Sequence, residues 1–305
     1  MSLILAADIG GTNIRAAIIT PQGKITEAVR TQISLDDRNI SENDLMIHLT
    51  SFFNEIIQKN TDIEAIGIGF PGFFLGNSGF LISSPNLPKL KNVELASRLS
   101  NNLNMPVSIQ NDALCAAMGE QRHGAGQGKQ NLLHLTLGTG IGGGLILNDA
   151  PYTGENGMAM EFGHLRVAHD DQARSCGCGG FGCVESYASA TAITEQYFEN
   201  TQIRINAKEI YEKACHGDLI AKDIIEHSGH YLGIALAEAI KLLDVHSVSI
   251  SGGLTGAWEL LHPNLIQSLN ANLIPPLQGK ISVLKSTLND NAGLLGAAAL
   301  VSCSS

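Results

Sequence analysis

The chain has 305 residues, of which 44% are hydrophobic and 16% charged, and it carries a formal net charge of −10. This length can bury a sizeable core and favours two domains in a soluble globular protein. The negative charge disfavours nucleic acid or an anionic membrane as a partner, and we expect neither. We find no secretory signal and no apolar run long enough to span a bilayer, so we expect a cytoplasmic protein.

Strands and helices alternate in the prediction for the first half of the chain, as in an α/β domain. Strands are predicted near residues 2–8, 13–20, 24–31, 63–70 and 106–110, and helices at 41–58, at 92–103 and from 111 onward. The helix at 41–58 is indicated most clearly, because Ser41 and Asp44 resemble a capping pair and apolar residues recur on one helical face.

The second half begins near residue 130 with a similar pair of strands. Helices are predicted at 184–198, 207–215, 218–243 and 292–301, and strands at 247–251 and 281–285. No linker rich in Pro or Ser, low-complexity segment or charge run separates the halves. We therefore expect domains joined by short ordered connections, with a cleft between them as the natural ligand site.

Two glycine-rich turns lie about 130 residues apart, and each joins one apolar run to another. The first turn is Ile9–Gly10–Gly11–Thr12, preceded by Asp8, and the second runs from Gly138 to Gly144 and includes Thr139 and Gly140. Glycine lets backbone amides approach an anion closely, because no Cβ intervenes. Two such turns in matching positions indicate a duplicated fold that holds a polyphosphate, which points to ATP and phosphoryl transfer.

Other interpretations of these turns are possible from the residues alone. A Walker P-loop requires a lysine that neither turn contains. Gly138, Gly140 and Gly143 match the dinucleotide pattern G-x-G-x-x-G, but that pattern should open a helix, whereas residues 145–149 are expected to form a strand and a turn. For either turn taken alone, an ordinary β-hairpin turn remains the alternative.

Asn111 and Asp112 follow a predicted strand and open a predicted helix. Both side chains suit a helix N-cap, which is the commoner role at such a position. A carboxylate at the C-terminal end of a strand in an open α/β sheet also faces the place where ligands bind. Asp112 is therefore a candidate general base for a substrate hydroxyl.

Cys176, Cys178 and Cys183 form a tight cluster in which glycines allow sharp turns. Three cysteines and a histidine make a closed tetrahedral zinc site, and a cytoplasmic setting argues against disulfides. We expect structural zinc rather than free thiols. Spacing alone does not choose between His164 and His169 as the fourth ligand.

Gly252 and Gly253 follow the predicted strand at 247–251. Because glycine has no side chain, such a pair can leave space for a nucleotide base or ribose beside the backbone. It suits a simple strand-to-helix turn equally well, and that is the commoner case.

Taken together, the motifs resemble those of the ROK family (repressors, open reading frames, kinases). They occur in that family's order at residues 8–12, 111–113, 137–144 and 161–164, followed by the cysteine cluster, and the resemblance extends from residue 3 to the segment 291–298. The segment 183–191 is most similar to the ROK glucokinases, with N-acetylhexosamine kinases close behind.

The resemblance implies an actin-like ATPase fold (ribonuclease-H-like), with two similar α/β domains around a central cleft. Residues 1–113 and 292–305 would form the N-terminal domain, and residues 114–291 the larger C-terminal domain with the zinc site. It also implies an ATP-dependent hexose kinase, a transferase of carbohydrate metabolism and glycolysis, that phosphorylates the sugar 6-hydroxyl. Glucose is the first candidate substrate, Mg2+ would accompany ATP, zinc would be structural, and a homodimer or homotetramer is implied.

The resemblance also assigns residues to roles, with Asp112 as the catalytic base. The implied sugar-binding residues are Gly72, Asn111, Asp112, Glu161, His164 and Glu185. The implied ATP-binding residues are Asp8, Gly10, Gly11, Thr12, Asn13, Gly138, Thr139, Gly140, Gly252 and Gly253. The implied zinc ligands are His164, Cys176, Cys178 and Cys183.

Three positions depart from the family's pattern. Asn13 stands where lysine is common, and Met160 and Ser251 stand where glycine is common. The first affects the expected phosphate contacts, and Met160 puts the choice of sugar in doubt.

Rival functions follow from the same resemblance. The related alternatives are kinases of N-acetylglucosamine or N-acetylmannosamine. A sugar-responsive transcriptional repressor without its DNA-binding domain is the alternative from another class, and a strand at the very start of the chain and the negative charge oppose DNA binding. A non-catalytic sugar-binding protein would need neither Asp112 nor two phosphate turns.

Overall fold

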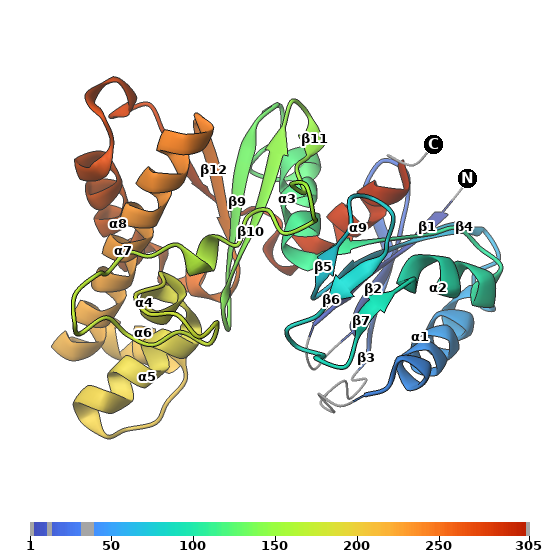
Figure 1. The fold of residues 1–305 in the computed structure, drawn as a ribbon, viewed down its shortest axis with the longest axis horizontal. Coiled ribbons are helices and arrows are strands. Elements are labelled where there is room, and N and C mark those ends of the chain that lie inside the picture. Colours follow the sequence, from blue (N-terminus) through green and yellow to red (C-terminus); the bar gives the residue numbers. More distant parts are fainter. Residues whose placement is uncertain (1–2, 11–13, 32–39, 303–305) are drawn as a thin grey trace. The chain divides into compact units, whose positions relative to one another are not determined.

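A computed structural model of the chain describes residues 3–10, 14–31 and 40–302 (Figure 1). Contacts divide the chain into two compact units. The first contains residues 1–130, 144–159 and 290–305, and the second contains 131–143 and 160–289. The domain boundaries expected at 113 and 292 stay a prediction. Each unit is described by itself below.

A five-stranded sheet forms the centre of the first unit, in the order β3-β2-β1-β4-β8. Its strands are β1 (Leu3–Ile9), β2 (Ile14–Ile19), β3 (Ile25–Thr31), β4 (Ile63–Phe70) and β8 (Val107–Asn111). Strands β1, β2 and β3 pair antiparallel, whereas β4 and β8 continue the sheet parallel to β1. The carboxyl ends of β1, β4 and β8 therefore meet at one edge of the sheet.

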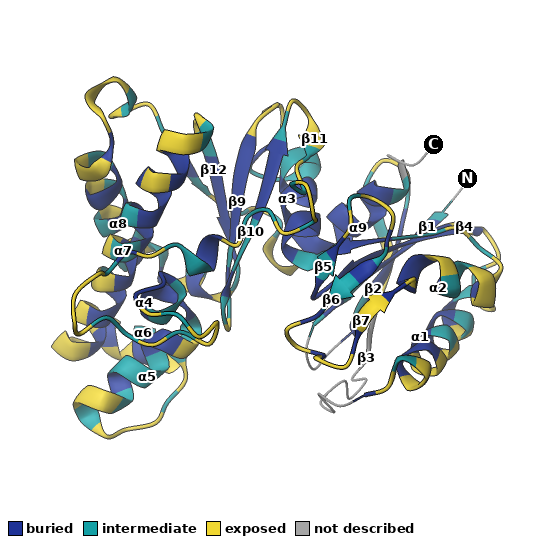
Figure 2. Cartoon of the chain, viewed as in Figure 1, coloured by how far each residue is buried: buried dark blue, intermediate teal, exposed yellow. Residues whose placement is uncertain are grey.

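Helices cover both faces of this sheet, because alternate residues of its strands point to opposite sides. The helices of the first unit are α1 (Glu42–Ile57), α2 (Leu95–Leu103), α3 (Asp112–His123) and α9 (Ala292–Ser302). Ile66 and Ile68 of β4 join the core packed by α1 and α2, and strand and inner helix surfaces are dark blue in Figure 2. Gly67, between them, faces α9, where its hydrogen approaches the backbone carbonyl of Ala297.

The interface between α3 and α9 is equally close. A Cβ added at Gly296 would lie 1.6 Å from the Cys115 carbonyl oxygen, so only glycine permits this approach. The small residues of α9 serve this backbone packing. A minor antiparallel sheet of β5 (Phe73–Phe74), β6 (Leu81–Ser83) and β7 (Lys91–Val93) follows β4.

A second five-stranded sheet has the order β11-β10-β9-β12-β13. Its strands are β9 (Leu132–Leu137), β10 (Ile141–Leu147), β11 (Ala150–Pro151), β12 (Ser247–Ser251) and β13 (Ser282–Lys285). Strands β9, β12 and β13 run parallel, and β11 returns antiparallel to β10. The strand order repeats that of the first sheet, so the duplication predicted from the two turns is confirmed at the level of topology.

The helices of the second unit are α4 (Glu185–Ala188), α5 (Ala190–Thr201), α6 (Ala207–Cys215), α7 (Leu219–Leu243) and α8 (Trp258–Asn272). Helices α7 and α8 pack closely, with Gly233 against the Leu265 carbonyl. Within the described ranges, no helix is both long and apolar enough to cross a bilayer.

Candidate active site and metal centre

Acidic side chains gather where the parallel strands of the first sheet end. Asp8 lies beside Gly69 in the register of β1 and β4, and Phe70 at the end of β4 pairs with Asn111 of β8. Asp112 follows directly as the first residue of α3. Because these strands are parallel, the sequence places Asp8, Asn111 and Asp112 at one edge, as the sequence analysis expected for a ligand site.

The Asp8 carboxyl at this edge has a raised pKa. Burial, and after it the Asp112 carboxylate, raise the pKa from 3.8 to about 6, although the nearby Arg15 guanidinium opposes the rise. A Cβ at Gly293, in the first turn of α9, would lie 2.9 Å from its Oδ2. Two partly buried carboxylates that repel each other favour a cation between or beside them.

Arg15 ties the start of α9 to this edge. Its guanidinium donates to the Asp290 carbonyl and, over 3.2 Å, to Asn291 Oδ1. The side chain on β2 thus fixes the segment that precedes α9. This contact joins positions 275 residues apart, so no local sequence pattern predicted it.

Asn111 is the N-cap of α3, and that interpretation of the sequence is confirmed. Its Oδ1 accepts a hydrogen bond from the Leu114 amide at 3.0 Å, and its Nδ2 donates to the Gly72 carbonyl at 3.2 Å. The cap role and a ligand role are compatible, because Oδ1 can accept, and Nδ2 can donate, one further hydrogen bond. Asn111 also brings the Gly72 backbone to the acid edge.

Asp112 has the electrostatics of a base. Burial raises the pKa of its carboxyl, while the Ala113 amide, 2.9 Å from Oδ1, partly offsets the rise. A carboxylate with a raised pKa takes a proton more readily than an ordinary aspartate.

The two glycine turns differ in how far they can be described. In the first, Gly10 follows β1, whereas Gly11, Thr12 and Asn13 lie outside the described residues. The second turn is complete between β9 and β10, and its Gly138 amide donates to the Gly140 carbonyl at 3.0 Å.

The Gly252–Gly253 pair lies beside the end of β9. Gly252 has φ +94, and a Cβ there would lie 2.2 Å from the Leu137 carbonyl oxygen, so glycine is required. The 3₁₀ helix η2 (Gly253–Ala257) begins at the second glycine. Within the described chain, no heavy atom other than those of the adjoining residues lies within 4 Å of a Cβ placed on Gly138 or Gly253.

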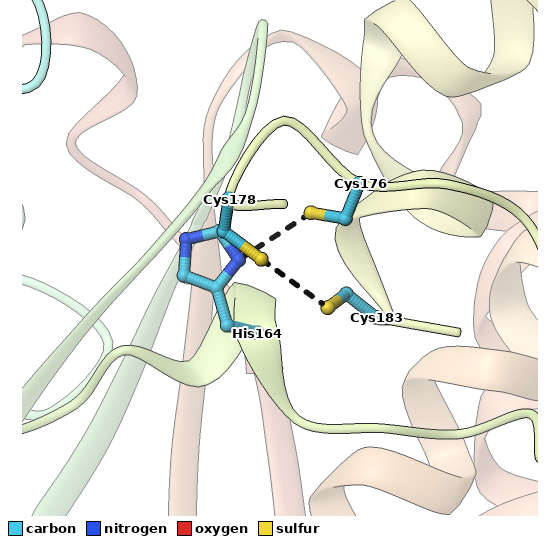
Figure 3. Close-up of side chains that lie close together, drawn as sticks. All are labelled: His164, Cys176, Cys178 and Cys183. Carbon is cyan, nitrogen blue, oxygen red and sulfur yellow. Dashed lines mark hydrogen bonds between the residues drawn. The ribbon is translucent and has the colours of Figure 1, made fainter. Parts of the chain in front are cut away.

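His164, Cys176, Cys178 and Cys183 converge in the second unit, with their ligand atoms all within 4.8 Å of one another (Figure 3). Cys178 Sγ and Cys183 Sγ are 3.8 Å apart, and Cys176 Sγ is 3.6 Å from His164 Nδ1. A tetrahedral zinc ion separates two sulfurs by about 3.8 Å and a sulfur from a nitrogen by about 3.5 Å. The donor set therefore fits zinc, and His164 rather than the exposed His169 is the fourth donor.

Glu161 and Glu185 flank this centre. The His164 Nε2 atom, turned away from the sulfurs, lies 3.6 Å from Glu161 Oε2. Glu185 follows Cys183 by two residues, and its Oε2 accepts a hydrogen bond from the Ile141 amide at 2.8 Å. Sequence reasoning missed this bond to the second glycine turn, because it links residues 44 positions apart.

A model of the ROK family matches residues 4–303 of the chain. A glucokinase of Halalkalibacterium halodurans is 31% identical over 97% of this chain and 94% of its own length. The chain belongs to the ROK family. A further ROK relative, the N-acetyl-D-glucosamine kinase of Mannheimia succiniciproducens, is 31% identical over 98% of the chain and 99% of its own length.

Solved ROK structures agree with the fold. The crystal structure of a ROK family glucokinase from Streptomyces griseus, in complex with glucose and AMPPNP, superposes with a TM-score of 0.82 at 30% identity, covering 98% of this chain and 99% of that one. The expected actin-like ATPase fold and family membership are thereby confirmed.

Met160 is a backbone outlier within this ROK chain. Its φ is +71, and most other non-glycine residues with positive φ in the described ranges are Asn or Asp, which tolerate that region. Its carbonyl and Cε lie against Gly143, where a Cβ would meet them at 2.6 and 3.2 Å. The departure noted in the sequence thus places a long apolar side chain, in a strained conformation, directly before Glu161.

Ser251 belongs to a buried polar network that the sequence analysis missed. His134 Nδ1 contacts Ser249 Oγ at 2.8 Å, and its Nε2 contacts Ser251 Oγ at 3.0 Å and Thr136 Oγ1 at 3.2 Å. Full burial lowers the pKa of His134 to about 3, so the ring is neutral. The network joins β9 to β12 immediately before the two glycine turns of this unit.

Proposed function

We propose that this ROK protein is an ATP-dependent hexose kinase that transfers the γ-phosphoryl group to the 6-hydroxyl of a sugar, with glucose preferred. The observation that carries the proposal is the partly buried pair of acids, Asp8 and Asp112, whose pKa values are raised at the carboxyl edge of the first sheet. Two full-length relatives named as sugar kinases and a glucokinase solved with glucose and AMPPNP support the reaction class.

Asp112 is the proposed base for the sugar hydroxyl. Its raised pKa lets the carboxylate accept the proton as the oxygen attacks phosphorus. Asn111 and the Gly72 backbone, joined by a hydrogen bond, are proposed to contact the sugar on the same unit. Glu161, His164 and Glu185 are proposed to hold other hydroxyls, because paired carboxylates and an imidazole distinguish epimers by hydrogen-bond geometry.

The phosphates of ATP are assigned to backbone amides. The main chain of Gly138 and Gly253 lies open in the part of the chain that the structure describes, and the turn Gly138–Thr139–Gly140 is proposed to form the nucleotide site together with Gly10 to Asn13 and Gly252–Gly253. Mg2+, bound with ATP, would neutralise charge on the phosphates. Asp8 is the residue placed to orient that ion, since its carboxylate lies beside a second acid and a helix N-terminus.

Zinc is proposed to be structural in this enzyme. Three sulfurs and His164 Nδ1 fill a tetrahedral set, which leaves no open position for a reacting ligand. The ion would fix the loop of residues 164–183 and hold the His164 ring so that Nε2 faces Glu161. We also propose a cytoplasmic location and a homodimer or homotetramer.

A coupled assay of ADP release tests the function. Purified protein with Mg2+ and ATP is supplied in turn with glucose, N-acetylglucosamine, N-acetylmannosamine, mannose, fructose and allose. We expect sugar-dependent ADP release with the largest kcat/KM for glucose. A larger kcat/KM for an N-acetylhexosamine would move the protein to the sibling activity. Equal release with and without every sugar would overturn the kinase proposal and favour a sugar-responsive regulator.

A further inference from the structure

We propose that the segment Glu185–Thr191 is a clamp that sets the Gly138–Ile141 turn for nucleotide binding, with Thr191 as a positioning residue. This inference rests on the proposed role of that turn in holding the phosphates of ATP. It assigns a task to a residue outside both the sugar-binding and the metal-binding sets, and it gives Glu185 a second task.

Three hydrogen bonds connect the clamp to successive parts of the turn. The Ala190 amide donates to the Gly138 carbonyl at 2.9 Å, and Thr191 Oγ1 donates to the Thr139 carbonyl at 2.8 Å. The Ile141 amide donates to Glu185 Oε2 at 2.8 Å. These bonds occupy carbonyls at the start of the turn and the amide at its end. The remaining amides of the turn are therefore held in one orientation, as an anion site requires.

Steric fit supports the same assignment. A Cβ on Gly140 would lie 2.4 Å from Glu185 Oε2, and a Cβ on Gly163 would lie 3.3 Å from the same oxygen. The carboxylate is thus wedged between the turn and the 3₁₀ helix η1 (Phe162–His164), which ends at a proposed zinc ligand. Only one carboxylate oxygen is used by the turn, so the other can contact a sugar hydroxyl.

The clamp is itself rigidly held. The Val184 amide donates to the Leu165 carbonyl at 2.9 Å, next to the metal centre. The Tyr187 carbonyl accepts from Ser228 Oγ of α7 at 2.9 Å, and Ser189 caps α5 by accepting from the Ala192 amide at 3.1 Å. Because the segment is fixed at both ends, its hydrogen bonds can hold the turn in one conformation, which a mobile segment could not do.

A variant that lacks the Thr191 hydroxyl tests the clamp separately from the proposed sugar-binding and zinc-binding residues. Thr191→Val keeps the shape and removes the bond to the Thr139 carbonyl. Thr194→Val is the matched control, because Thr194 lies one turn further along α5 and its hydroxyl donates to the Ala190 carbonyl within the helix. Both variants remove one hydroxyl from the same helix, but only the first disturbs the turn.

Isothermal titration with Mg2+ and AMPPNP, in the absence of sugar, measures the effect. We expect Thr191→Val to raise the Kd by about three- to tenfold, the usual effect of one lost hydrogen bond. The Kd for glucose should stay within about twofold of the wild type, and Thr194→Val should leave both values unchanged. Thermal melts and circular dichroism establish that each variant is folded.

Glu185 supplies a second, independent arm of the test. In Glu185→Gln the amide oxygen still accepts from Ile141, so we expect weaker glucose binding with AMPPNP affinity retained. Glu185→Ala removes the bond and should weaken both. If wild-type and Thr191→Val proteins bind AMPPNP equally well, the clamp is refuted while the proposed function stands. If the wild type itself binds no AMPPNP, the proposed function fails and the clamp fails with it.

Discussion

The two five-stranded sheets share one strand order, yet their carboxyl edges carry opposite chemistry. In the first sheet, Asp8 on β1 lies beside Gly69 on β4, and the edge is acidic. In the second sheet, Thr136 on β9 lies beside Ser251 on β12, and the edge carries hydroxyls around a neutral imidazole. The same backbone plan therefore carries carboxylates at one edge and neutral polar groups at the other.

The difference suits a phosphoryl transfer, in which one site must accept a proton and another must hold the phosphates. Buried carboxylates attract a cation and a proton but repel phosphate. Hydroxyls and glycine amides accept the negative phosphates without that repulsion.

Removing the metal centre should harm the second unit alone. In Cys183→Ser a buried sulfur ligand is lost, and we expect zinc content to fall from one ion per chain to near zero. Structural zinc contributes on the order of several kcal/mol to folding, so the melting temperature should drop by many degrees. Elemental analysis measures the zinc content, thermal melts measure the melting temperature, and hydrogen exchange locates the loss of structure. Unchanged exchange in residues 164–191 after zinc loss would contradict the structural role.

Removing the base should abolish the chemistry and spare binding. We expect Asp112→Asn to lower kcat at least about 100-fold, the usual contribution of a positioned base. The amide keeps the size of the side chain, so the Kd values for glucose and AMPPNP should stay near those of the wild type. Steady-state kinetics and calorimetry make the comparison. Near-wild-type turnover would remove Asp112 from the mechanism.

The second sheet, whose carboxyl edge carries the hydroxyls around His134, should lose stability in acid. Burial depresses the pKa of His134 to about 3, below its ordinary 6.5, so the unfolded chain binds the proton more tightly. Stability is fully present above pH 6.5 and declines as pH falls toward 3, by roughly 1.4 kcal/mol per pH unit at most. His134→Gln should lose this dependence, which urea unfolding at pH 7 and pH 5 detects. An identical acid response in the variant would exclude His134 as its source.

The carboxyl edge of the first sheet, which carries Asp8 and Asp112, should change the stability with pH in the opposite direction. Since the pKa of Asp8 is raised from 3.8 to about 6, its contribution to stability is fully present below pH 3.8 and is lost as pH rises through 6. In magnesium-free buffer, Asp8→Asn should therefore be more stable than the wild type at pH 8, by on the order of 2 kcal/mol. The gain should vanish at pH 4. A variant less stable than the wild type at pH 8 would contradict the buried-charge argument.

Local signals predicted most of the fold, and the failures have local causes. The helix from Ser41 and the strand from Ile63 to Phe70 were predicted well, because periodicity and caps determine them. Helix α8 was missed: Leu261, Leu265 and Leu269 recur at helical spacing, but Pro263 lies inside the helix, and a proline argues against a helix in a sequence-based prediction. The helix predicted at 184–198 is divided, since Ser189 ends α4 and caps α5.

At the site, the sequence predicted what lies close along the chain. The cysteine cluster and the pair Asn111–Asp112 carry their chemistry in adjacent residues, and the predicted His164 joins the sulfurs. The bonds from Glu185 and Thr191 to the glycine turn, and the His134 network, join distant residues through tertiary structure. No spacing rule reveals such contacts. The predicted start of a helix at 92 was wrong, because residues 91–93 form β7.

The position of the transferred phosphate decides whether the protein phosphorylates the 6-hydroxyl of its sugar. Wild-type protein is incubated with Mg2+, ATP and either glucose or 6-deoxyglucose, and the products are identified by phosphorus and carbon NMR. The account predicts glucose 6-phosphate and ADP in equal amounts from glucose, with no sugar phosphate from 6-deoxyglucose. Phosphate on another hydroxyl, or ADP formed at the same rate with both sugars, would contradict it.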